Sequence, residues 1–419
     1  MRSGSSDWPA DAIPRSWSSG SGTGSRRLSC PGCRFPSPRF FTPESHKDSG
    51  ADSEGGLLRG ILTLGILSSL FLASCGGGGG SSSPPISCTP SGGVAFSGKN
   101  FSFNLPTGIA VDANNNVWVT NTGGNTVTEL PASNPNAPIV YSSNSFHFDL
   151  PADVAIDGNN NVWITNLNNA SVTEIPSGSP NSPAVYLPNV TSFFPLGIAV
   201  DGTNNIWVAN KGDLSGNGSL TEITASGSIT NYPGGSDGIY NPTLDAVDSS
   251  NDIWFTNPNQ PSVTKFIPGN PSISKTYSSS NCSLCGFINP FGIAIDGSGN
   301  VWITDNTANS VIELPAQNPT NPNVYNASKY NFSEPSGIAV DGANNIWVVS
   351  NDGGIITEIP SSNPNSPNVF KSSGSCSNLS GTYVGIAIDG SGNIWASNET
   401  NNSVTEFVKA GSPITVPLR

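Results

Sequence analysis

The stretch GIAVDANNNVWVTN, residues 108–121, decides the fold. An apolar run, an Asn-rich polar corner and a second run with Trp118 form the pattern of a β-hairpin. Six variants of it follow, beginning at Asp153, Gly197, Leu244, Gly292, Gly337 and Gly385. Each copy keeps an aspartate and, six residues later, a tryptophan, at 112 and 118, 157 and 163, 201 and 207, 248 and 254, 296 and 302, 341 and 347, and 389 and 395. The repeat length of 44 to 48 residues is that of one propeller blade.

Four short runs separated by turn-forming residues make up each copy. In the first copy they are Gly108–Asp112, Val117–Thr120, Thr126–Leu130 and Pro138–Ser142. One such sheet buries too little apolar surface alone, so the copies must stack. The sequence therefore predicts an all-β fold, a seven-bladed β-propeller of four-stranded antiparallel blades over residues 101–419. The run Ser412–Leu418 looks like the last blade's own fourth strand, which predicts closure without a strand from the N-terminus.

The segment before the repeats indicates where in the cell the protein is located and shows no pattern of a folded domain. Residues 1–56 are rich in Ser, Gly, Pro and Arg without apolar periodicity, so we expect disorder there, or translation that starts instead near residue 57. Residues 57–74 form an apolar run shorter than a membrane span. Its end, with Cys75, resembles the bacterial lipobox, which implies lipidation of Cys75, an uncleaved anchor being the alternative. Residues 75–100 are expected to be a tether, and the location the cell envelope, by family analogy the outer membrane.

The net charge and the cysteines indicate which binding partners and which cross-links to expect. A formal net charge of −13 argues against nucleic acid. Beyond Cys75 the cysteines are Cys88, Cys282, Cys285 and Cys376, an even set in an exported chain, so disulfides are expected. Three pairings are possible. We favour Cys282–Cys285 with Cys88–Cys376, and zinc is disfavoured because no histidine lies nearby.

Ligands of propellers usually bind at one end of the central channel, where loops enter the innermost strand and leave the second one. Here the entry loops include LPTG (105–108), LPAD (150–153) and NPFG (289–292). The exit loops begin at Asn121, Asn166, Asn210, Asn257, Asp305, Ser350 and Asn398. Each blade has the same order of motifs: Pro-x-Gly-Ile-Ala, a polar corner, a Trp-containing strand and a third strand of the Thr-Glu-Phe type. This order resembles that of the NHL-like propellers, among them the streptogramin B lyase family. That family is metal-dependent, and its catalytic groups are an entry-loop His and a Glu three places after a Trp. The resemblance implies that catalytic residues of this chain would stand at the same positions.

The chain departs from that family at the chemistry. The entry-loop His position holds Thr107, Ala152, Leu196, Thr243, Phe291, Ser336 and Val384, none of which is a general base near neutral pH. The Glu position is acidic only at Asp305, which alone is a weak metal ligand. His147 is the one histidine after Cys75 and reads as a surface residue. We therefore predict no catalytic residues, and no cofactor unless Asp153, Asp245 and Asp305 collect a divalent cation, Mg²⁺ or Ca²⁺.

Two sets of regular residues are predicted to be structural. The corner aspartates should cap their own turns, and the third-strand glutamates should accept hydrogen bonds from a neighbouring strand or blade. Aromatic residues ahead of the entry loops should pin the crossovers between blades. Alternatively, rings such as Phe148 and Phe291 face outward as a stacking surface, with the exit asparagines supplying hydrogen bonds.

The function predicted from these residues is a monomeric, lipid-anchored binding or scaffold propeller. Its ligand would be a protein, peptide or glycan at the channel mouth, contacting the exit residues (Asn121, Asn166, Asn210, Asn257, Asp305 and Asn398) with Asp153, Asp245, Phe148 and Phe291. The alternative is a divergent metal-dependent lyase or hydrolase at the same end.

Overall fold

The structure is a computed structural model that describes residues 93–142, 144–187, 194–212, 218–235, 238–371 and 380–415. Every described residue lies in one compact unit, Leu72–Arg419. The predicted leader and signal peptide, Cys75, Cys88 and Cys376 lie outside the described residues. Within the described part, no helix is long and apolar enough to cross a membrane.

Seven four-stranded antiparallel sheets confirm the predicted blades. The innermost strands are β2 (Pro106–Val111), β6 (Pro151–Ile156), β10 (Pro195–Val200), β14 (Asp245–Val247), β18 (Pro290–Ile295), β22 (Pro335–Val340) and β26 (Tyr383–Ile388). The second strands are β3 (Val117–Asn121), β7 (Val162–Asn166), β11 (Ile206–Asn210), β15 (Ile253–Asn257), β19 (Val301–Asp305), β23 (Ile346–Ser350) and β27 (Ile394–Asn398). The third strands are β4 (Thr126–Leu130), β8 (Ser171–Ile175), β12 (Ser219–Ile223), β16 (Ser262–Phe266), β20 (Ser310–Leu314), β24 (Ile356–Ile359) and β28 (Ser403–Phe407).

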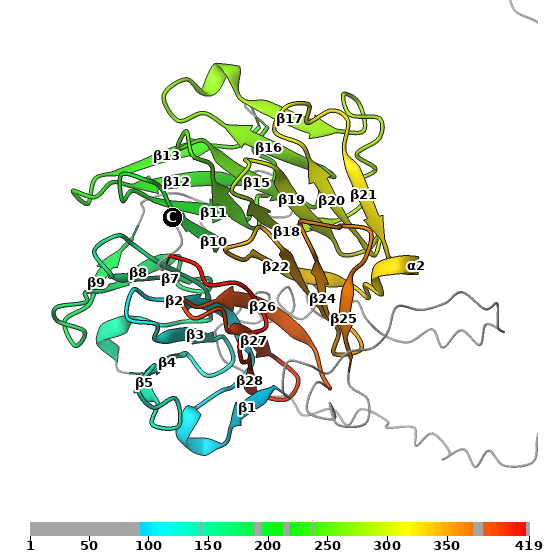
Figure 1. The fold of residues 1–419 in the computed structure, drawn as a ribbon. Helices are drawn as coiled ribbons and strands as arrows, with labels where there is room; N and C mark the ends of the chain where they lie inside the picture. The colour runs from blue at the N-terminus through cyan, green and yellow to red at the C-terminus, as the bar shows by residue number, and fades with distance from the viewer. Residues whose placement is uncertain are drawn as a thin grey trace, which may run out of the picture. The chain divides into compact units, whose positions relative to one another are not determined.

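The outermost strands complete the blades. They are β5 (Ile139–Tyr141), β9 (Ala184–Tyr186), β13 (Ile229–Pro233), β17 (Lys275–Ser278), β21 (Asn323–Asn326), β25 (Asn368–Phe370) and, in blade seven, β1 (Val94–Ser97). The helical elements of the described residues are single turns, namely η1 (Lys99–Phe101), η2 (Asn144–Phe146), η3 (Pro271–Ile273) and α2 (Ala327–Tyr330). Each innermost strand contacts the next, and β26 contacts β2, so the blades close a ring around one axis (Figure 1).

Closure of the ring differs from the prediction. β1 pairs with β28 from Val94 opposite Glu406 to Ser97 opposite Ser403, so an N-terminal strand does complete the last blade (Figure 1). The propeller therefore begins at Val94, not at residue 101. The expected fourth strand at 412–418 does not pair with β28, because β1 already occupies the free edge of that strand; residues 412–415 are not in a strand, and residues 416–418 lie outside the described part. Ser412 lies instead on the corner of blade six, where its carbonyl accepts the N–H of Gly342 at 3.2 Å.

Apolar side chains fill the space between neighbouring blades. Trp118 of blade one packs with Val154 and Ile156 of blade two, and Trp395 of blade seven packs with Phe96 and Ile109. The aromatic residues ahead of the entry loops join these clusters, among them Phe101, Phe103, Phe146, Phe148, Phe287, Tyr330, Phe332 and Tyr383, all of which are buried. Their predicted role as pins of the crossovers is confirmed.

A belt of hydroxyl groups joins the innermost strands around the channel. In blade five, Thr304 Oγ1 accepts the N–H of Gly292 at 2.7 Å and donates to the carbonyl of Ser336 in blade six at 2.8 Å. Further hydroxyls donate in the same way to the next blade, from Thr120 to Ala152, Thr165 to Leu196, Thr256 to Phe291, Ser336 to Tyr383 and Ser397 to Thr107. Between blades three and four the equivalent position is Ala209, which has no hydroxyl.

Candidate functional site

Each blade corner is a hydrogen-bonded unit around its aspartate. In blade one, Asp112 Oδ1 accepts the backbone N–H groups of Asn114 and Asn116 at 2.8 and 2.9 Å. Its Oδ2 accepts the indole Nε1–H of Trp118 at 3.1 Å, and this Asp–Trp bond recurs in all seven blades. The next corner residue, Asn115, has a φ of 64°, which asparagine and glycine tolerate best. The turn-capping role of the aspartates is confirmed.

The third-strand glutamates also have structural partners. Glu129 accepts the hydroxyl of Tyr141 at 2.8 Å, and the same pairing joins Glu174 to Tyr186, Glu222 to Tyr232 and Glu313 to Tyr325. Burial raises the pKa of Glu129, although the hydrogen bond from Tyr141 opposes the shift. The predicted structural role is confirmed for these four glutamates and for Glu358, which accepts the side-chain amide of Asn368 at 2.8 Å in its own blade.

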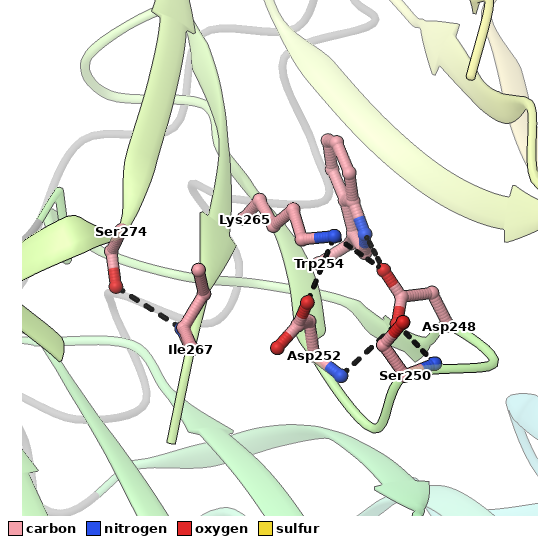
Figure 2. Close-up of polar contacts among 7 residues, drawn as sticks. All are labelled: Asp248, Ser250, Asp252, Trp254, Lys265, Ile267 and Ser274. Atoms are coloured by element: carbon pink, nitrogen blue, oxygen red, sulfur yellow. Dashed lines mark hydrogen bonds and ion pairs between the residues drawn. The ribbon is translucent and has the colours of Figure 1, made fainter. Parts of the chain in front are cut away.

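Blade four replaces this arrangement with an ion pair. Lys265 stands at the glutamate position, and its Nζ lies 2.8 Å from Asp248 Oδ2 and 2.9 Å from Asp252 Oδ2 (Figure 2). Asp252 occupies the position of Asn116, whose amide donates to the corner aspartate in blade one. The carboxylate of Asp252 cannot donate a hydrogen bond to Asp248 in this way. Lys265 supplies the donor to Asp248 instead.

The exit asparagines point into their own blades. Asn121 Nδ2 donates to Thr126 Oγ1 at 3.0 Å and to Thr128 Oγ1 at 2.9 Å in β4. Comparable bonds to their own third strands hold Asn166, Asn210 and Asn257, while Asn398 donates to the carbonyl of Ser380. All five side chains are fully buried. Contact with a ligand therefore does not follow from their positions, because they join the second strand to its neighbours.

Asp305 is likewise committed to the backbone. It accepts the N–H groups of Ile288, Asn289 and Ala308 at 2.7, 3.0 and 3.0 Å and is fully buried. The surroundings of Asp305 do not match those expected for the metal ligand predicted at this residue. Across the described ranges, no group of three or more His, Cys, Asp or Glu side chains is placed to hold a metal ion.

Asp153 and Asp245 lie apart from Asp305, on the innermost strands β6 and β14. Burial raises the pKa of Asp153 to about 6. Burial, and secondly the charge of Asp153, raises the pKa of Asp245 well above its usual range. The two residues are partly exposed as whole residues, but both carboxylate oxygens of Asp245 are buried without a hydrogen-bond partner.

The positions that would carry lyase chemistry hold no base. Thr107 uses its hydroxyl to bond Thr122 Oγ1 at 2.7 Å and the carbonyl of Ala152 at 2.9 Å. Ser336 is fully buried and donates to the next blade, and Phe291 lies half-buried on β18. His147 is exposed in the turn after η2. Phe148 stacks on Phe146 with ring centroids 5.2 Å apart and is buried, so the outward stacking surface predicted for it is wrong.

One channel end is framed by a pair of residues from each of six blades; in blade four the residue after Asn257 is Pro258, which has no N–H to donate. In each pair, one residue immediately precedes the innermost strand and the other immediately follows the second strand. The carbonyl of the first accepts the N–H of the second. In blade one, the N–H of Thr122 donates to the carbonyl of Leu105 at 3.1 Å. The other pairs are Leu167 with Leu150, Lys211 with Phe194, Asn306 with Asn289, Asn351 with Glu334 and Glu399 with Thr382. We call these residues the mouth, because they precede or follow strands that surround the axis.

The mouth has two chemically different arcs. Blades one to three contribute the partly or largely exposed Leu105, Leu150, Leu167 and Phe194, whereas their polar residue Thr122 is buried; Leu105 is 41% exposed. Blades five to seven contribute Asn289, Asn306, Glu334, Asn351, Thr382 and Glu399, all partly exposed. Lys211 ends the apolar arc, and burial lowers its pKa. Burial raises the pKa of Glu399 in the polar arc. The arrangement offers apolar contact on one side and amide and carboxylate groups on the other.

Sequence reasoning missed the mouth by one position. The sequence pattern points to the residue that ends each second strand, an asparagine in five blades, whereas the residue after it varies from blade to blade and, apart from the buried Thr122, is partly exposed. Variation inside a regular repeat was the available signal, since residues that build every blade must be alike. Of the predicted disulfides, Cys282–Cys285 is present and confirmed, and it holds the loop before blade five.

Comparison with known proteins supports the class of fold. Residues 103–130 match the NHL repeat family model. No curated protein matches the sequence. The ring defines a seven-bladed propeller, and one stretch of it, residues 103–130, resembles an NHL repeat.

The fold is that of the streptogramin B lyases. One streptogramin B lyase structure is 17% identical, with a TM-score of 0.61 over 75% of this chain and 95% of that one. A catalytically inactive virginiamycin B lyase from Staphylococcus aureus, solved with quinupristin, is 19% identical, with a TM-score of 0.62 over 75% and 98%. PorZ, a bacterial surface component of the type-IX secretion system of Porphyromonas gingivalis, is 15% identical, with a TM-score of 0.56 over 74% and 47%. These identities establish a shared fold, and the PorZ match shows that it also occurs at bacterial surfaces.

Proposed function

We propose that this protein is a binding propeller of the bacterial cell envelope that holds an amphipathic peptide or protein segment at its mouth, a glycan being the alternative ligand. The carrying observation is the division of the mouth into an apolar arc and an amide-rich arc. A peptide offers apolar side chains to the first and backbone hydrogen-bonding groups to the second. Lys211, which has a lowered pKa at the end of the apolar arc, would favour a carboxylate of the ligand.

The alternative of a divergent metal-dependent lyase or hydrolase rests on the fold alone. Thr107 and its equivalents supply no general base, and the hydroxyls of Thr107 and Ser336 are engaged in blade-to-blade bonds. A binding role needs no such base. It requires only a surface whose side chains differ around the ring, as those of the mouth do.

Site-specific photo-crosslinking tests the binding site. A photoreactive amino acid at Leu167 or Asn351 should capture a discrete partner in intact cells, whereas the same group at Val324, exposed on the outermost strand β21, should not. Lys211→Met combined with Leu150→Asn should abolish capture at position 351. Equal capture at Val324, or capture unaffected by the mouth substitutions, would contradict the proposal.

The anchor is tested separately. We propose lipidation of Cys75, supported by its lipobox-like context and by the surface location of PorZ. Cys75→Ser should prevent incorporation of labelled palmitate and move the protein from the membrane fraction to the soluble fraction. Retention of label by Cys75→Ser would show that the anchor is elsewhere.

A further inference from the structure

An asparagine latch joins the corners of neighbouring blades. In each latch, the residue after one corner aspartate donates its N–H to the side-chain oxygen of an asparagine in the next corner. Ala113 of blade one donates to Asn160 Oδ1 of blade two at 2.7 Å. The other latches, at 2.7 to 2.9 Å, join Gly158 to Asn204, Gly202 to Asn251, Gly297 to Asn344 and Gly390 to Asn115. Five of the seven junctions therefore have the same bond.

Glycine replaces the accepting asparagine at the two remaining junctions. Gly299 holds this position between blades four and five, and Gly392 holds it between blades six and seven, each with a φ of 80°. The asparagines of the latches have φ values of 61° to 66°, so the backbone is left-handed at this position of every corner. The two exceptional corners lack only the side-chain oxygen that would accept the N–H of the preceding blade.

The chain segment that follows β28 fills the gap at Gly392. The carbonyl of Ser412 accepts the N–H of Gly342 at 3.2 Å, which is the bond that an asparagine makes elsewhere. The N–H of Ser412 donates to Asp341 Oδ2 at 3.0 Å, and the N–H of Gly411 donates to the carbonyl of Gly392 at 3.0 Å. The segment therefore bonds to the corners of both blades through main-chain groups.

This segment and a side chain at position 392 exclude each other. A Cβ built on Gly392 would lie 2.4 Å from the carbonyl oxygen of Gly411 and 3.0 Å from the nitrogen of Pro413. Ala410 and Ile414, on either side of these contacts, are partly buried and pack against the apolar cluster shared by blades six and seven. Pro413 itself is exposed, so the segment lies at the surface of the molecule.

The junction of blades four and five shows that the gap can stay empty. Among the described residues, a Cβ built on Gly299 would have only the Cβ of Ala316 within 4 Å, at 3.6 Å. No other described segment therefore lies over this corner, although β14 and β18 pack together as neighbours. A blade junction thus forms without a latch or a substitute for it, and the segment over Gly392 is not required for its junction to form.

We propose that residues 410–415 are a detachable strap, and that Asp341, Gly342 and Gly392 form a peptide seat that the strap occupies. The seat binds an extended segment through one carbonyl and two N–H groups, so its ligand is a peptide with a small residue over Gly392 and no required charge. The corners connect the ends of the strands that lie opposite the mouth. The seat is therefore independent of the ligand proposed for the mouth.

Amide hydrogen exchange on the full-length chain tests the strap. In the wild type, the amides of Gly342 and Ser412 should both be protected. Gly392→Asn supplies the latch and removes the room for the strap, so protection at Ser412 should fall by about tenfold or more while Gly342 stays protected. Gly299→Asn, the same substitution at the junction without a strap, should leave Ser412 unchanged. Equal protection of Ser412 in the wild type and Gly392→Asn would overturn the proposal.

Binding of an added peptide tests the seat. Full-length Ser412→Pro lacks the N–H that Asp341 accepts, so its strap should detach. This variant should bind a fluorescent peptide of residues 410–415 about tenfold or more tightly than the wild type, in which the seat is occupied. Adding Gly392→Asn should abolish this binding. A peptide that binds the wild type and Ser412→Pro equally, or binds neither, would overturn the proposal.

Discussion

Lys265 Nζ lies 2.9 Å from Asp252 Oδ2, and both residues depart from the repeat together. The other blades place an asparagine or its equivalent at the corner and a glutamate on the third strand. Blade four has exchanged the neutral amide for a carboxylate and the carboxylate for an ammonium group. Lys265 also lies over the ring of Trp254, 5.4 Å from its centroid, so the ammonium group contacts the tryptophan as well as the two carboxylates.

Reversing this exchange in two steps should reveal the coupling. Lys265→Glu alone places a third carboxylate beside Asp248 and Asp252 and should lower the free energy of unfolding by about 2 kcal/mol. Adding Asp252→Asn recreates the pair found in blade one and should recover most of this loss. Urea unfolding of wild type, both single variants and the double variant gives the coupling energy. Additive effects would mean that the two positions do not compensate each other.

The hydroxyl belt should contribute to stability at each junction. Thr304→Val keeps the shape of the side chain but leaves the buried N–H of Gly292 and the carbonyl of Ser336 without this partner, which should cost about 2 kcal/mol. Valine already stands at the equivalent Val349 in blade six, where Ser336 donates to the next blade instead. Val349→Ile, which changes volume but no donor, is the matched control. A Thr304→Val protein as stable as wild type would show that the belt is dispensable.

Ring closure by β1 should depend on Phe96. Its ring is buried, with its centroid 5.6 Å from that of Trp395 in the same blade, so Phe96→Ala should cost about 3 to 4 kcal/mol. Val94→Ala, in the same strand but 46% exposed, should change stability by less than about 1 kcal/mol. Both are measured by denaturant unfolding. A similar effect of the two substitutions would argue against the observed pairing.

Asp153 should make stability depend on pH in cation-free buffer. Its pKa is raised by burial from 3.8 to about 6, so between these values the native state binds more protons than the unfolded state. The free energy of unfolding should therefore fall as pH rises through this window and level off above it, by at most about 3 kcal/mol. Asp153→Asn lacks this contribution, so its stability relative to wild type should increase from pH 3.5 to pH 7. An unchanged difference would mean that Asp153 titrates normally.

Sequence periodicity predicted the fold well, because the residues that build a blade must repeat. The Asp112 to Trp118 spacing specifies a hairpin, and seven copies specify a ring. Closure was less predictable: Val94–Ser97 carries no repeat signature, and the run at 412–418 is apolar enough to resemble a strand. Only the pairing of β1 with β28 distinguishes the two solutions.

The candidate site was predicted less well, for a related reason. Asn121 recurs because it holds its own blade together, and regularity was mistaken for function. Leu167, Lys211 and Asn351 share no residue type, and nothing in the order of the residues shows that their neighbouring loops meet. Asp245 was noticed as an acid, but its burial against Gly197 follows from contact between blades and not from local sequence.

The pairing of β1 with β28 also sets the order in which the molecule can be completed. The chain is synthesised from its N-terminus, so β1 is made long before its partner strand β28. Until β28 is made, β1 has no partner strand, and the apolar face around Phe96 stays uncovered. The last blade is thus completed only near the end of synthesis: a chain interrupted before residue 403 would leave the edge of β1 unpaired and prone to associate with other strands.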